Sequence, residues 1–79
     1  MLVALAILLT LERHASLAAE QIAAELGEKP HAVNAVLQEL RQQGLVDAVV
    51  VGEVEGDATQ AASYWRLTEE GRTYLGRLR

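Results

Sequence analysis

The stretch EKPHAVNAVLQELRQQGLV, residues 28–46, decides the fold. Pro30 suits the first turn of a helix, because its missing N–H has no intrahelical acceptor at that position anyway. Gly44 stands where a helix ends, and β-branched residues follow it. Aliphatic residues recur at i, i+4 and i+7 and predict one buried stripe: Val33, Leu37 and Leu40. We therefore predict a helix that ends at a glycine and leads into a strand.

A shorter helix precedes this one. The segment ASLAAEQIAAELG, residues 15–27, has the apolar spacing of a helix with one inner side. Gly27 stands where a left-handed residue commonly follows a helix. Two packed helices joined by about three residues form a helix-turn-helix, which we place at about residues 17–43. The inner side of the shorter helix is expected to carry Leu17, Ile22, Ala23 and Leu26.

The N-terminal run MLVALAILLTL ends at Glu12 and is about half the roughly 20 residues that a membrane span needs. It also lacks the basic start and small-residue cleavage site of a secretory signal. We predict a buried first helix and no membrane association. A second apolar side remains beside Arg13. This side carries Leu2, Ala6 and Leu9. It is either a homodimer contact or a set of isolated apolar residues on the surface.

The C-terminal half reads as a hairpin and a last helix. LVDAVVVGEV predicts a strand, EGDATQAAS a loop and YWRL a returning strand. Thr68 can cap a last helix at about 69–78. We expect Tyr74 and Leu75 to pack this helix against the core. The chain is thus mainly α with a small β-hairpin, in the order α-α-α-β-β-α. We assign residues 1–79 to one winged helix-turn-helix domain, with its wing at about 45–67.

Composition narrows the function. Seven Lys and Arg against eleven Asp and Glu give a formal charge of −4, which opposes long-range attraction to nucleic acid. The absence of cysteine indicates a reducing, cytoplasmic setting without disulfides or thiolate metal sites. His14 and His31 form no helical His–carboxylate motif, so we expect no metal and no other cofactor. With no glycine-rich phosphate loop and no nucleophile near a histidine, the chain is not expected to be an enzyme.

Three fragments, in this order, resemble a known superfamily: LAAEQIAAELG, VNAVLQELRQQGLV and YWRLTEEGRTYL. They are similar to the winged helix-turn-helix domain of bacterial transcriptional regulators of the MarR and PadR kind. In those families L…L…GLV ends the recognition helix, and Y.LT..G…L closes the wing and opens the next helix. The resemblance covers about residues 5–78. It implies a small, DNA-binding transcriptional regulator, which we expect to act as a homodimer.

A narrower resemblance covers residues 18–44, AAEQIAAELGEKPHAVNAVLQELRQQG. This segment is similar to the small FeoC proteins that accompany bacterial ferrous-iron transporters. The FeoC wing usually carries a cysteine cluster, and this chain has no cysteine. The departure removes the iron–sulfur chemistry and leaves only the shared scaffold.

In the regulator families the second helix of the helix-turn-helix enters the major groove, and the wing touches the flanking backbone or minor groove. Asparagine and glutamine can form paired hydrogen bonds with the N6 and N7 edge of adenine, while lysine can reach guanine or a phosphate. Arg41 and Arg66 are expected to hold phosphates. By position, the resemblance places these residues in the major groove: Lys29, His31, Asn34 and Gln38.

The wing supports a competing hypothesis. The segment GEVEGDATQAAS, residues 52–63, carries three acids and neither Lys nor Arg, and DNA phosphates would repel it. The chain could instead be a protein-interaction module or adaptor that docks through its first helix or through these wing residues: Glu53, Glu55 and Asp57. Lys29, Arg41 and Arg66 on one continuous face would favour DNA, whereas scattered cations would favour a protein partner.

Overall fold

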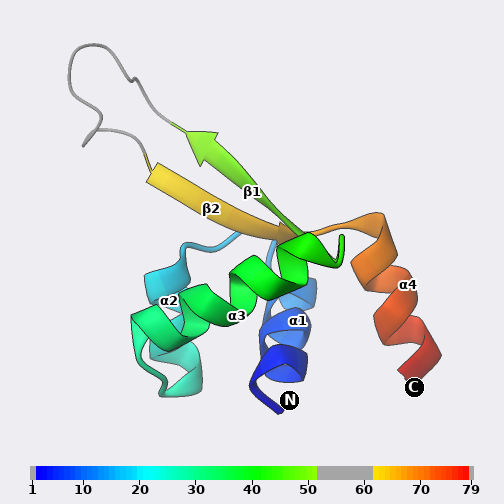
Figure 1. The fold of residues 1–79 in the computed structure, drawn as a ribbon, viewed down its shortest axis with the longest axis horizontal. Coiled ribbons are helices and arrows are strands. Elements are labelled where there is room, and N and C mark those ends of the chain that lie inside the picture. Colours follow the sequence, from blue (N-terminus) through cyan, green and yellow to red (C-terminus); the bar gives the residue numbers. More distant parts are fainter. Residues whose placement is uncertain (1, 52–61, 79) are drawn as a thin grey trace.

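A computed structural model describes residues 2–51 and 62–78, which form four helices and a β-hairpin (Figure 1). The order α-α-α-β-β-α and the winged helix fold are as predicted. The three acidic wing residues Glu53, Glu55 and Asp57 lie outside the described residues. The elements are α1 (Leu2–Arg13), α2 (Ala19–Leu26), α3 (Pro30–Gln42), β1 (Val46–Val51), β2 (Ala62–Leu67) and α4 (Glu69–Leu78).

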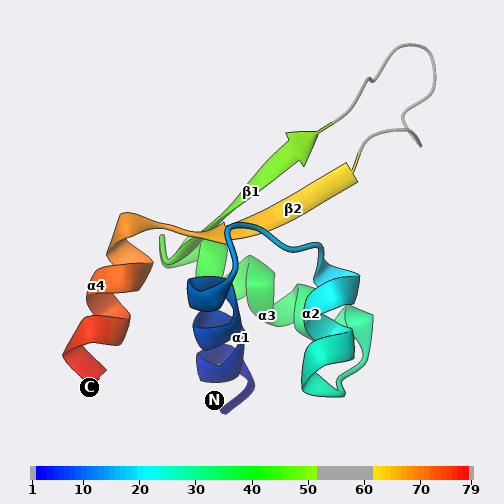
Figure 2. The ribbon, with the colours of Figure 1, turned by 180° about the vertical axis from the view of Figure 1, so that it is seen from behind.

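The hairpin is antiparallel and pairs Val46 with Leu67 at its base. Leu17 extends it with an isolated bridge: its N–H donates to the Trp65 carbonyl at 3.0 Å, and the Trp65 N–H donates to the Leu17 carbonyl at 2.7 Å. Figure 2 shows the segment between α1 and α2 running beside the base of β2. The prediction that Leu17 belongs to the inner side of α2 is wrong, because Leu17 pairs with β2 and α2 begins only at Ala19.

The helix boundaries follow from local chemistry. Gly27 ends α2 with a φ of 70°, and Gly44 follows α3 with a φ of 80°, both in the left-handed region that glycine enters without steric cost. Pro30 is the first residue of α3. At the start of α2, the side-chain oxygen of Gln21 accepts a hydrogen bond from the Ala18 N–H at 2.9 Å. These signals fix where α3 begins and ends, and therefore which of its residues lie near the hairpin.

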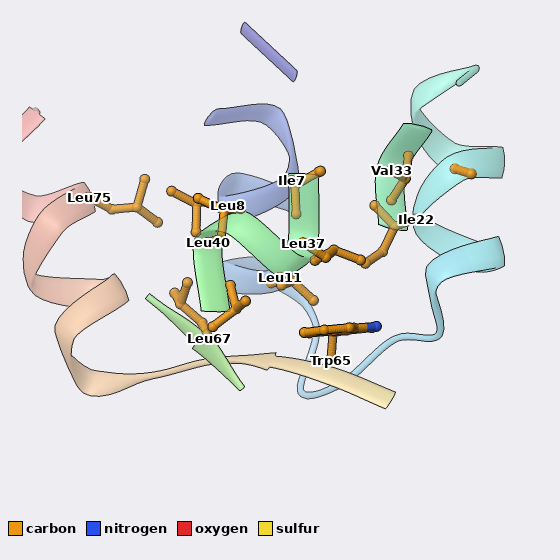
Figure 3. Packing of buried hydrophobic residues seen from close by; sticks show 12 residues of the cluster. Ile7, Leu8, Leu11, Ile22, Val33, Leu37, Leu40, Trp65, Leu67 and Leu75 are labelled. Atoms are coloured by element: carbon orange, nitrogen blue, oxygen red, sulfur yellow. The ribbon is translucent and has the colours of Figure 1, made fainter. Parts of the chain in front are cut away.

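One aliphatic core joins all six elements (Figure 3). The predicted stripe of α3 is buried, and the indole of Trp65 covers the core beneath the hairpin. Thr10 is buried as well, and its hydroxyl donates to the Ala6 carbonyl at 2.8 Å, so it leaves no unpaired polar group. The buried hydrophobic residues are Ile7, Leu8, Leu11, Ile22, Ala23, Val33, Leu37, Leu40, Val46, Trp65, Leu67 and Leu75.

Thr68 joins α4 to the turn that follows α3. Its hydroxyl accepts a hydrogen bond from the Gly71 N–H at 3.0 Å, which is the predicted cap, and donates to the Gly44 carbonyl at 2.7 Å. Its N–H donates to the Leu45 carbonyl at 3.1 Å. Leu75 anchors the helix in the core, whereas Tyr74 is 42% exposed. The prediction that Tyr74 packs against the core is wrong, because it lies off the side of α4 that carries Leu75.

Gly71 provides a test of this joint. A Cβ at Gly71 would collide with the Leu45 carbonyl oxygen and with the Leu67 side chain, whereas a Cβ at Gly76 would meet open space. We expect Gly71→Ala to lower the free energy of unfolding by about 1–3 kcal/mol, the usual cost of overpacking. Gly76→Ala, in the same helix, should raise it by about 0.5–1 kcal/mol through helix propensity. Urea unfolding measures both, and equal effects of the two changes would contradict the close contact.

Candidate nucleic-acid interface

The side of α3 opposite the buried stripe carries the residues predicted to read bases. Lys29, His31, Asn34 and Gln38 are all exposed. Burial of the core stripe fixes the rotation of α3, so His31, Asn34 and Gln38 must lie away from the core, while Lys29 precedes the helix. Asn34, Gln38 and Arg41 follow one another at i, i+4 and i+7 and form a row along one edge of that side. The structure thus presents a polar row on a rigid helix.

Part of this row borders an open cleft of about 630 Å³ between α3, the start of α2 and β2. Among the residues that line it are His31, Asn34 and Gln38. Lys29, Arg41 and Arg66 do not line it. The structure therefore brings three of the four predicted base readers to one concave surface and leaves the predicted phosphate contacts outside it.

Sequence reasoning missed the other walls of this cleft. Ser63 and Tyr64 line it from β2, and Glu20 lines it from the first turn of α2. The alternation of a strand signals that Tyr64 lies on a different side from the buried Trp65. No sequence signal shows that residues of β2 and α3 line one cleft, since this depends on tertiary packing. Glu20 adds a negative charge to a surface that would otherwise suit DNA.

The cations near this surface differ in their surroundings. Among the described residues, no ion pair involves Lys29 or Arg41. Arg66 stands opposite Asp47 in the hairpin register, and its Nη2 atom lies 3.8 Å from Asp47 Oδ2. Its neighbours Trp65 and Leu67 are buried in the core, so Arg66 projects from the outer side of the hairpin. An ion pair this exposed contributes at most about 1 kcal/mol, so Arg66 can exchange Asp47 for a phosphate.

Arg13, at the end of α1, forms an ion pair with Glu25 of α2. Its Nη2 lies 2.9 Å from Glu25 Oε1, and His14 Nε2 lies 3.7 Å from the other oxygen of the same carboxylate. This cluster ties the end of α1 to α2. The cations near this surface are thus Lys29 before α3, Arg41 on α3 and Arg66 on the hairpin, whereas Arg13 pairs with Glu25.

The described residues also bear on other classes of function. No three or more His, Cys, Asp or Glu side chains in this part of the chain gather into a group that could hold a metal ion. Of the helices that the structure describes, none has the length and apolar character needed to cross a membrane.

Comparison with known proteins places this chain in a family. A model of the MarR family matches residues 2–58, which include α1, α2, α3 and β1. No curated protein matches the sequence. The crystal structure of the YusO protein from Bacillus subtilis is similar, with a TM-score of 0.75 and 26% sequence identity. The match covers 94% of this chain and 49% of the YusO chain, so this chain spans about half the length of that relative.

The family match agrees with the winged helix fold. It favours the resemblance to MarR regulators over the narrower one to FeoC proteins. On the family model and the shared winged helix, the chain belongs to the MarR family of transcription regulators.

Proposed function

We propose that this chain binds double-stranded DNA sequence-specifically and that α3 reads the major groove. The observation that carries the proposal is the exposed row Asn34, Gln38 and Arg41. Two of its members, Asn34 and Gln38, line an open cleft together with His31. A rigid helix with outward-pointing amides is the element that recognition in a major groove requires. Membership of the MarR family supports this function over a protein-interaction module.

The chemistry of the row suits base recognition. Each amide of Asn34 and Gln38 offers a donor and an acceptor, which match the N6 and N7 edge of adenine. His31 stands one turn before Asn34, and Lys29 precedes the first turn of α3. From that position Lys29 can reach guanine or a phosphate. A well-formed bidentate contact discriminates against the wrong base by about 1–3 kcal/mol.

Phosphate contacts are few, and this limits the affinity of one copy. Arg41 is exposed beyond Gln38 along α3, and Arg66 lies on the hairpin beside Asp47. Each lost phosphate contact removes salt-dependent affinity. Two copies would recover it by presenting two α3 helices to half-sites about 34 Å apart. A homodimer is therefore part of this proposal.

The sequence suggested α1 as the dimer contact. Leu9 is 39% exposed and Ala6 is partly exposed, so both can contribute to such a surface. The side chain of Leu2 lies outside what the structure describes. The α1 contact through Leu2, Ala6 and Leu9 therefore remains a proposal.

Base reading by α3 predicts a specific loss in one variant. Selection from a random duplex library should yield preferred sites, and Asn34→Ala with Gln38→Ala should bind those sites at least about tenfold more weakly. Binding to random duplex should change less than about twofold, because phosphate contacts remain. Gln43→Ala is the matched control, since Gln43 is exposed after α3 and outside the cleft. Fluorescence anisotropy at about 50 and 200 mM salt measures the affinity of each variant for both kinds of DNA. An equal loss of affinity for selected sites and for random duplex would contradict base reading.

Release of Arg66 from Asp47 gives a second prediction. Asp47→Asn removes the carboxylate charge but keeps the oxygen that accepts from the Ala48 N–H at 2.9 Å. Affinity for random duplex at low salt should rise about twofold to fivefold. The rise should vanish in an Arg66→Ala background. Glu69→Gln on α4 controls for the change in net charge, and the same rise in that variant would show that Arg66 makes no phosphate contact.

A further inference from the structure

The two edges of the hairpin differ in what covers them. The edge of β2 is covered at its base, because Leu17 pairs with Trp65. In the part of the chain that the structure describes, β1 pairs with β2 alone. An open strand edge is a template to which another strand can add. The side of β1 away from β2, which we call the outer edge, is therefore a candidate interaction surface.

Hydrogen bonds outside the ladder show which backbone groups of β1 face the outer edge. The N–H and the carbonyl of Trp65 both bond to Leu17, so they point away from Ala48, the partner of Trp65 in β1. In an antiparallel ladder such pairs alternate with hydrogen-bonded pairs. The Thr68 N–H donates to the Leu45 carbonyl at 3.1 Å, which agrees with this alternation. The residues of β1 that direct N–H and carbonyl groups to the outer edge are Val46, Ala48 and Val50.

The outer edge becomes accessible at Ala48. Val46 is 2% exposed, so its backbone groups are covered, whereas Ala48 is only half-buried. A strand that adds to an antiparallel edge bonds to every second residue. Such a strand would therefore need the Ala48 N–H as its first donor and the Val50 N–H as its next. Closing the Ala48 N–H blocks one end of a short edge.

The Asp47 side chain occupies that donor. The Ala48 N–H donates to Oδ1 of Asp47 at 2.9 Å, and Oδ2 of the same carboxylate lies 3.8 Å from Nη2 of Arg66. A side-chain oxygen that accepts from a nearby backbone N–H is a common local interaction and needs no function. The position of this one, at the first accessible donor of the outer edge, gives it a consequence. The edge also carries the negative charge of Asp47, whose side chain is 48% exposed.

We propose that Asp47 closes the outer edge of β1 to strand addition by β1 of a second copy. The strand that a second copy offers continues as AVVV, residues 48–51, which is uncharged and mostly β-branched. Such a composition favours strand pairing. Two outer edges are also complementary, because antiparallel pairing about a two-fold axis matches N–H to carbonyl reciprocally. This inference does not depend on DNA binding and is tested without DNA.

Removal of the carboxylate tests the closure. Sedimentation velocity from about 10 to 500 μM compares the wild type with Asp47→Ala and Asp47→Asn. Asp47→Ala frees the Ala48 N–H in both copies and should self-associate at least about tenfold more strongly than the wild type. Asp47→Asn should match the wild type to within about twofold, because its amide oxygen still accepts from that N–H. Glu39→Ala removes an exposed acid of α3, controls for net charge and should also match the wild type.

Two further measurements distinguish strand addition from unfolding, and circular dichroism melts check that each variant is folded. In Asp47→Ala, protection of the Ala48 and Val50 amides against hydrogen exchange should rise with protein concentration, since both enter the new ladder. Adding Val50→Pro should restore the wild-type behaviour, because it removes an N–H that faces outward and no bond to β2.

Three results would overturn the proposal. The first is an Asp47→Ala variant that sediments like the wild type. The second is equal self-association of Asp47→Ala and Asp47→Asn, because the hydrogen bond to the Ala48 N–H would then not be what closes the edge. The third is self-association of Asp47→Ala that persists with Val50→Pro, since the contact would then lie away from the outer edge.

Discussion

Burial of the aliphatic stripe of α3 is the constraint on which the rest of the structure depends. Val33, Leu37 and Leu40 are at most 4% exposed and contribute about 1.5–3 kcal/mol each through burial. Because a helix is rigid about its own axis, fixing one side fixes the other. The amides of Asn34 and Gln38 point outward because the opposite side of α3 is in the core. The same interaction therefore stabilises the fold and orients the proposed recognition surface.

Two short sets of hydrogen bonds hold the hairpin and α4 in place around this helix. The bridge between Leu17 and Trp65 fastens the start of α2 to the hairpin and so forms two walls of the cleft beside α3. The hydrogen bonds of Thr68 fasten α4 to the turn after α3. The hairpin and α4 thus keep a set position relative to the exposed amides. The proposed recognition surface on α3 is thereby held in one rigid unit with the hairpin and α4.

The elements that have strong local signals were predictable from the sequence. The local preferences of Pro30 and Gly27 predicted a helix start and a helix end, and apolar periodicity predicted the buried stripe of α3. The structure confirms all three predictions. Leu17 was wrongly assigned because its environment depends on a partner distant in the chain. Tyr74 was wrongly assigned because it lies off the side of α4 that Leu75 buries in the core. Apolar periodicity counted Leu17 as helical although its backbone pairs with β2. The cleft was predictable only in part, since α3 supplies one wall and β2 and α2 supply the others.

The most direct test of base reading by α3 is the NMR signal of its side-chain amides. An ¹⁵N-labelled sample would be titrated with a selected duplex while the side-chain NH₂ resonances of Asn34, Gln38 and Gln43 are followed. If α3 reads bases, the Asn34 and Gln38 resonances shift on binding, because their amides form new hydrogen bonds, while Gln43 moves little. DNA binding that leaves Asn34 and Gln38 unmoved would contradict the account, and the recognition surface would then lie elsewhere on the chain.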